Sequence, residues 1–173
     1  MELSYWSVSN LSYSRLTWPW GLVQPQVDPG HKLTCKPVGV HILWTSPVDS
    51  VEGWYEWCQA AAFMSGIQGH QHWQLTLSDA ANLLVIDKES DLEPIVQEFP
   101  CSCSECIRYQ RMKLTLGFPV DFPALAEKYD GIHLTAEGQW RTHLTTPLSL
   151  YGWDCETVVL FNIDHVSNPR RLL

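Results

Sequence analysis

The chain has 173 residues, of which 45% are hydrophobic and 17% charged, and its formal net charge is −8 at pH 7. This composition is typical of a globular protein, and the length allows one domain over residues 1–173 that folds without metals or disulfides. The acidic balance argues against sequence-independent binding to a nucleic-acid backbone, which relies on clustered lysine and arginine, although a single extruded base can still be a substrate.

The amino-terminal segment MELSYWSVSN has neither the basic region nor the apolar region of a secretory signal. No window of the sequence approaches the ~18 consecutive apolar residues that a membrane span needs. The sequence therefore predicts a cytoplasmic protein without a membrane partner.

The first part of the chain is predicted to hold two strands and a helix. Residues 3–9 (LSYWSVS) have the aromatic and β-branched content of a strand and are followed by a long stretch rich in turn residues. Residues 39–47 (GVHILWTSP) alternate as a second strand. Ser46 then has the character of a helix N-cap with Pro47 as the first helical residue, and the helix is expected to extend to about Ser65.

The remaining sequence interleaves strands and helices without a strict alternation. Strands are predicted at 72–78, 82–87, 132–135 and 158–161, and helices at 90–99 and 121–129. A loop is expected from Ala136 to Trp153, and the segment at about 100–117 is expected to be an irregular, exposed excursion. The pattern favours an α+β fold, with a mixed or antiparallel split sheet as its core and flanking helices.

Three of the six cysteines lie in the run CSCSEC within that excursion: Cys101, Cys103 and Cys106. Their C-x-C-x2-C spacing can supply three thiolates to zinc, with Cys35 or a histidine as a fourth ligand. The paired C-x2-C knuckles that define the common zinc modules are missing. We therefore favour loop thiols without a metal and keep a structural zinc ion as the second interpretation.

Two carboxylates stand at the start of the last predicted strand, in the segment YGWDCETVVLFN (151–162). Asp154 and Glu156 precede an apolar run that is expected to be buried. A carboxylate at the start of a buried strand is either hydrogen-bonded there or held in place for chemistry. In the simpler interpretation they only end the strand and keep its edge soluble. In the other they are catalytic.

Four segments in chain order, SYWSVS, ILWTSP, KYDGIHLT and WDCETVVLFN, resemble the ADP-ribosyltransferase-like fold family. In that family a first strand supplies a histidine or arginine, a second strand ends in serine or threonine, and a late strand carries a glutamate. The resemblance implies that Glu156 is the catalytic glutamate and that Asp154, two residues earlier, assists the acceptor. It also implies that the loop from Glu137 to Trp153 helps to select the target.

The resemblance further implies that NAD is the substrate and that the strand ends bind it. Thr45 and Ser46 match the serine or threonine position beside the NAD cleft. Trp6, with Ser7 beside it, stands where the family has histidine or arginine, and Trp6 or Trp44 can stack on the nicotinamide. Because of this departure, the ribose and pyrophosphate contacts must come from other residues: Arg15, His31 or Arg141.

The implied function is transfer of ADP-ribose from NAD to a macromolecular acceptor, a protein or a nucleic-acid base. Cleaving the bond between nicotinamide and ribose builds positive charge on the anomeric carbon, as in glycoside hydrolysis, and a fixed carboxylate stabilises that charge. With water as the acceptor, the same site would be an NAD glycohydrolase. The alternative from another class is a non-enzymatic interaction protein on the same fold.

Overall fold

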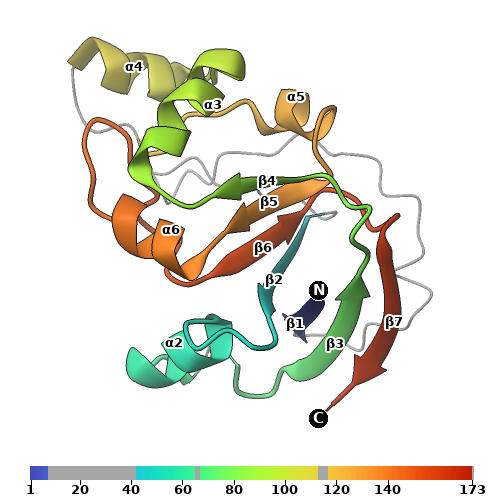
Figure 1. The fold of residues 1–173 in the computed structure, drawn as a ribbon. Helices are drawn as coiled ribbons and strands as arrows, with labels where there is room; N and C mark the ends of the chain where they lie inside the picture. The colour runs from blue at the N-terminus through green and yellow to red at the C-terminus, as the bar shows by residue number, and fades with distance from the viewer. Residues whose placement is uncertain (8–41, 65–66, 113–116, 173) are drawn as a thin grey trace.

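The computed structural model describes residues 1–7, 42–64, 67–112 and 117–172 (Figure 1). Its centre is a seven-stranded mixed sheet in the order β4-β5-β6-β2-β1-β3-β7. Neighbouring strands are antiparallel except β4 and β5, which are parallel. The strands are β1 (Glu2–Ser7), β2 (Leu43–Pro47), β3 (Gln71–Leu77), β4 (Leu83–Ile86), β5 (Gly131–Leu134), β6 (Thr157–Leu160) and β7 (Val166–Arg171).

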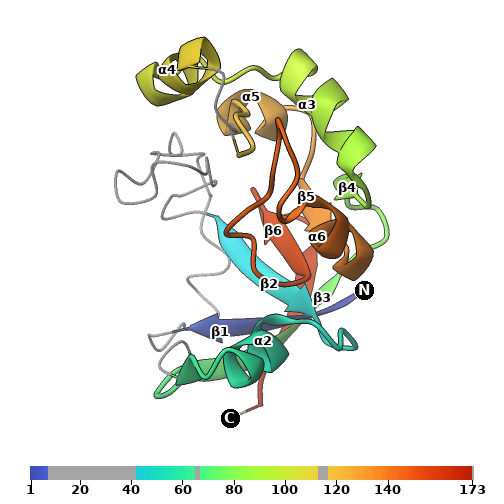
Figure 2. The same ribbon diagram turned by 90° about the vertical axis from the view of Figure 1, so that its left-hand side faces the viewer.

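Short helices lie around this sheet, and the predicted α+β class is confirmed. The helices are α2 (Trp54–Ala60), α3 (Leu92–Glu98) after the 3-10 turn η2 (Glu89–Asp91), α4 (Ser104–Met112), α5 (Phe122–Ala126) and α6 (Ala136–Thr142). Figure 2 shows α3 and α5 to one side of β4, β5 and β6, and α2 at the other end, near β1; α6 lies at the end of β4, where Gly138 approaches the Ile86 carbonyl. Within the described residues, no helix has the length and apolar character to cross a bilayer.

The sheet bends where its two halves meet. β1 and β2 share only two residue pairs, Leu3 with Pro47 and Ser4 with Ser46, whereas β1 and β3 pair along the whole of β1. The half made of β4, β5, β6 and β2 therefore turns toward the half made of β1, β3 and β7 (Figure 1). We call the surface inside this bend the inner face and the opposite surface the outer face.

A hydrophobic core lies on each face. The inner core contains Leu3, Leu75 and Val158, and so joins the two halves of the sheet. The other core lies between β4, β5 and β6 and the helices, and it includes Leu92 of α3 and Leu125 of α5. Because β6 packs against both cores, all four of its residues are buried. A strand buried on both faces has a continuous run of apolar residues, and this run made β6 predictable from the sequence.

The prediction that a helix starts at Pro47 is wrong. Pro47 is the last residue of β2, and α2 begins only at Trp54. The Ser46 hydroxyl does not cap the next turn; it accepts a hydrogen bond from the Trp54 backbone N–H at 3.0 Å, eight residues later. Val51, within the range predicted to be helical, precedes α2 and is 83% exposed.

The two segments predicted to be irregular both contain helices. Residues 100–117 include α4, and residues 136–153 begin with α6. Thr135 caps α6, because its hydroxyl accepts a hydrogen bond from the Gly138 backbone N–H at 2.9 Å. Glycine within a helix lowers the stability of that helix. Gly138 is nevertheless required in α6, because a Cβ at this position would stand 2.1 Å from the Ile86 carbonyl oxygen.

Candidate active site

Glu156 stands directly before β6, and its carboxylate is held by groups from three other parts of the chain. Its Oε1 accepts a hydrogen bond from His133 Nε2 of β5 at 3.0 Å. The Ser50 side chain and the Ala136 backbone N–H also hydrogen-bond to it. The side chains of Glu156 and His133 are each only 14% exposed. We call Glu156, His133, Ser50 and the Ala136 N–H the Glu156 cluster.

The strand register explains why these side chains meet. His133 pairs with Val158 across β5 and β6, and Val158 belongs to the inner core. Because side chains alternate along a strand, Glu156, two residues before Val158, projects to the same face and is a diagonal neighbour of His133. The Glu156 cluster therefore lies on the inner face, at the start of β6.

The Glu156 cluster favours the ionised form of its carboxylate. The hydrogen bond from His133 has the largest effect and lowers the pKa of Glu156, while burial opposes it. The hydrogen bonds from Ser50 and Ala136 and the charge of His133 lower this pKa further, so that the net shift is below the ordinary value. Glu156 is consequently a fixed negative charge at neutral pH.

Thr45 and Ser46 lie beside the start of β6, and both hydroxyls donate to backbone carbonyls of that segment. The Thr45 hydroxyl donates to the Val158 carbonyl at 2.7 Å. The Ser46 hydroxyl donates to the Glu156 carbonyl at 2.9 Å, in addition to its bond with the Trp54 N–H. Thr45 is 4% and Ser46 3% exposed, so both hydroxyls hold β2, β6 and the start of α2 together.

The two tryptophans proposed to contact NAD project away from the Glu156 cluster. Trp6 stacks on His72 at 4.3 Å between ring centroids and on Tyr55 of α2 at 5.6 Å. Tyr5, the preceding residue, packs on the inner core, so Trp6 lies on the outer face of β1. Trp44 packs against Trp153 in the core under the helices, also on the outer face.

Other aromatic side chains occupy the inner face instead. Tyr5 pairs with Trp73 across β1 and β3, and Tyr5 contacts the inner core. Both residues therefore project to the same face as Glu156. Sequence reasoning did not find them, nor His133 and Ser50, because only the strand pairing shows which residues share this face.

The remaining predicted site residues are distributed as follows. Asp154 is half-buried in the segment just before β6. Ser7 ends β1, where its backbone pairs with Gln71. Arg141 lies on the exposed side of α6 and forms an ion pair with Glu137, one turn earlier. Arg15, His31 and Cys35 lie outside the described residues.

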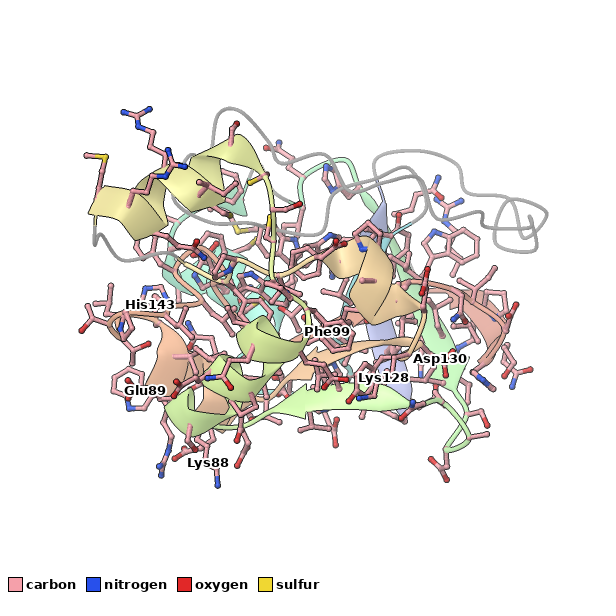
Figure 3. All side chains as sticks on the ribbon, turned by 90° about the horizontal axis from the view of Figure 1, so that it is seen from above. Lys88, Glu89, Phe99, Lys128, Asp130 and His143 are labelled. Carbon is pink, nitrogen blue, oxygen red and sulfur yellow. The ribbon has the colours of Figure 1, made fainter. Side chains whose placement is uncertain are left out.

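Asp130, just before β5, has a structural role at the end of the sheet away from Glu156. Its carboxylate accepts hydrogen bonds from the Asn82 N–H and the Asn162 side chain, both at 2.8 Å. Burial alone would raise the pKa of Asp130, but these hydrogen bonds and the charge of His165 lower it overall. The Phe161 N–H donates to the Asp130 carbonyl at 2.8 Å, so Asp130 lies beside the end of β6, whereas Glu156 stands before its start; Figure 3 shows Asp130 beside Lys128.

Cys155, between the two carboxylates, is not a nucleophile at neutral pH. The residue is 6% exposed, and burial raises the pKa of its thiol to about 11. A thiol protonated at neutral pH has little thiolate to react or to bind a metal. The chemistry of this site therefore rests on its carboxylates and on His133.

Comparisons of the chain with protein-family models, with curated proteins and with solved structures find no match. The residues of the site and their geometry therefore carry the functional proposal.

Replacing Ser46 with alanine is expected to lower the free energy of unfolding by about 1–3 kcal/mol. The substitution removes one hydroxyl that serves two groups, the Trp54 N–H and the Glu156 carbonyl. Urea denaturation of the native chain and the variant measures the difference. Ser90→Ala, at an exposed position of η2, is the matched control. Equal stability of Ser46→Ala and the native chain would show that neither hydrogen bond contributes.

Acid is expected to remove the stabilisation that the ionised Glu156 provides. The folded-state pKa of Glu156 is lower than that of the unfolded chain, so its contribution is complete above the unfolded value of about 4.3. The contribution is lost as the pH falls from there through the folded-state value. Urea unfolding from pH 7 into this acid range, on the native chain and on Glu156→Gln, should show their stability difference shrinking. A difference that is constant with pH would contradict the shift.

Proposed function

We propose that this protein is an ADP-ribosyltransferase that cleaves the bond between nicotinamide and ribose in NAD and transfers ADP-ribose to a macromolecular acceptor. The observation that carries the proposal is the Glu156 carboxylate, ionised and fixed by hydrogen bonds on the inner face of the sheet. The four segments that resemble the ADP-ribosyltransferase-like family supply the reaction class.

The proposed chemistry needs a negative charge that does not move. As nicotinamide leaves, the ribose becomes an oxocarbenium-like cation, and a carboxylate already in position stabilises it without reorganisation. His133 fixes one oxygen of Glu156, and its ring is itself held on a central strand. In this mechanism Glu156 is the catalytic residue and His133 the positioning residue.

The acceptor and cofactor contacts follow from the neighbouring residues. Asp154 precedes Glu156 by two residues, and we assign it the role of drawing a proton from the acceptor. On the inner face, Tyr5 and Trp73 offer aromatic surfaces to a nicotinamide or adenine ring, which Trp6 and Trp44 do not, because they project to the outer face.

A second candidate function, a non-enzymatic interaction protein, is favoured by a different observation. The segment proposed to select the target presents large apolar side chains to solvent. Trp140 is 79%, Leu144 77% and Tyr151 52% exposed. An exposed group of this kind is common at protein interfaces. In a transferase this surface would contact the acceptor. In an interaction protein it would bind the partner, and the protein would have no catalytic role.

Incubation with NAD labelled in its adenylate part, in the presence of a cell extract, tests the proposal. Release of nicotinamide together with label in the macromolecular fraction is expected for the native chain. Separate protease and nuclease digestions then show whether the acceptor is a protein or a nucleic acid. Nicotinamide release without label transfer indicates a glycohydrolase. No release above that of Glu156→Gln would overturn the enzymatic proposal and leave the interaction protein.

A further inference from the structure

The three cysteines of the CSCSEC run converge in space. The Sγ atoms of Cys101, Cys103 and Cys106 all lie within 4.8 Å of one another. Tetrahedral zinc holds sulfur at about 2.3 Å, which places two ligand sulfurs roughly 3.8 Å apart. Small side-chain rotations are enough to reach that geometry. An iron–sulfur cluster would need wider spacing, because its thiolates bind different iron atoms.

Helix α4 fixes two of these cysteines. Cys103 immediately precedes the helix, and its Sγ accepts a hydrogen bond from the Cys106 backbone N–H at 3.4 Å. A backbone N–H directed at sulfur stabilises a thiolate and orients it as a ligand. The Ile107 N–H donates to the Cys103 carbonyl at 3.1 Å, so the backbone between the two cysteines is held in a helical turn.

The third cysteine is held by the adjoining backbone. The Cys101 N–H donates to the Pro119 carbonyl at 2.9 Å, and Pro100 forms a bridge with Val120. Cys106 is 3% exposed, and Cys101 and Cys103 pack against the core under the helices. The three sulfurs are therefore positioned by backbone contacts from two sides and lie at the edge of a core.

We propose that Cys101, Cys103 and Cys106 bind one Zn²⁺ ion through three thiolates, with the fourth position taken by a donor outside this trio. Soft thiolate ligands select zinc over the oxygen-preferring divalent cations. The ion fastens the start of α4 to the strand-like segment around Pro100 and Val120. This site is separate from the Glu156 cluster, so the zinc proposal does not depend on the proposed function.

Metal analysis of the purified chain tests the site. The native chain, prepared without a metal-affinity step and dialysed against a weak chelator, is expected to retain about one zinc ion per chain. Because Cys106 is buried, its replacement tests folding as well as binding; Cys103→Ser, at a half-buried position, carries the test. That variant should lose the zinc while keeping the native circular dichroism. Ser102→Ala, at an exposed position between Cys101 and Cys103, is the control and should retain it.

Two further measurements identify the ligands. Replacing zinc with Co²⁺ should give the thiolate charge-transfer and visible bands of a tetrahedral sulfur-ligated ion, and Cys103→Ser should abolish them. Removing zinc with a strong chelator should lower the melting temperature of the native chain and leave that of Cys103→Ser unchanged. A folded native chain without zinc, or equal zinc in Cys103→Ser, overturns the proposal. A denatured, metal-free mass lower by two hydrogen atoms, which would show a disulfide within the trio, overturns it as well.

Discussion

Replacing Glu156 with glutamine is expected to lower the rate of nicotinamide release from NAD by about 10²–10³-fold. Glutamine has the same shape and still accepts a hydrogen bond from His133, but it carries no charge to stabilise the ribose cation. The loss corresponds to roughly 3–4 kcal/mol in the barrier, the magnitude found when one preorganised electrostatic group is removed. Initial rates measured at saturating NAD give the comparison directly.

The control for this experiment is another glutamate-to-glutamine change at a site with no proposed role. Glu127, exposed just after α5, meets that condition. Glu127→Gln should turn over NAD at the native rate, and circular dichroism should show both variants folded. If Glu156→Gln and Glu127→Gln were equally active, the carboxylate of Glu156 would have no part in the reaction.

Replacing Gly138 with alanine is expected to lower the free energy of unfolding by about 1–3 kcal/mol. Alanine in a helix interior is ordinarily more favourable than glycine by about 1 kcal/mol, so helix propensity alone predicts the opposite sign. Here the new Cβ would stand 2.1 Å from the Ile86 carbonyl oxygen and 2.9 Å from its carbon. These are backbone atoms, which cannot rotate away, so α6 must shift from the end of β4.

The same change should also reach the candidate active site. The first turn of α6 supplies the Ala136 N–H that hydrogen-bonds to Glu156, so a displaced helix weakens the Glu156 cluster. Urea denaturation measures the stability and the NAD assay the activity. Trp140→Ala, on the same helix but at a 79% exposed side chain, should change stability by no more than about 0.5 kcal/mol. A Gly138→Ala chain as stable as the native one would contradict the close approach.

The two kinds of test are independent. Cys103→Ser tests the metal site at the edge of the core under the helices. Glu156→Gln tests the candidate active site on the inner face. A chain that binds zinc but does not cleave NAD would therefore keep the metal site and remove the enzymatic proposal. A chain that cleaves NAD but binds no zinc would keep the enzymatic proposal and remove the metal site.

Local signals in the sequence were sufficient for much of the fold. The apolar run of β6 predicted a buried strand, and the residues around Leu92 and Phe122 predicted α3 and α5. The position of Glu156 at the entrance to β6 was also readable, because a carboxylate next to an apolar run marks a strand end. These features depend on residues a few positions apart, whose preferences act before any distant contact forms.

The partners of Glu156 and the convergence of the cysteines required the tertiary structure. His133 and Glu156 become neighbours only through the register of β5 with β6, and alternation then decides that Tyr5 faces the inner core while Trp6 does not. In the sequence, Gly138 disfavours a helix, whereas in the structure close packing against the end of β4 requires glycine at this position. Register and close approach are set by hydrogen bonds and excluded volume between distant segments, and no short stretch of sequence carries that information.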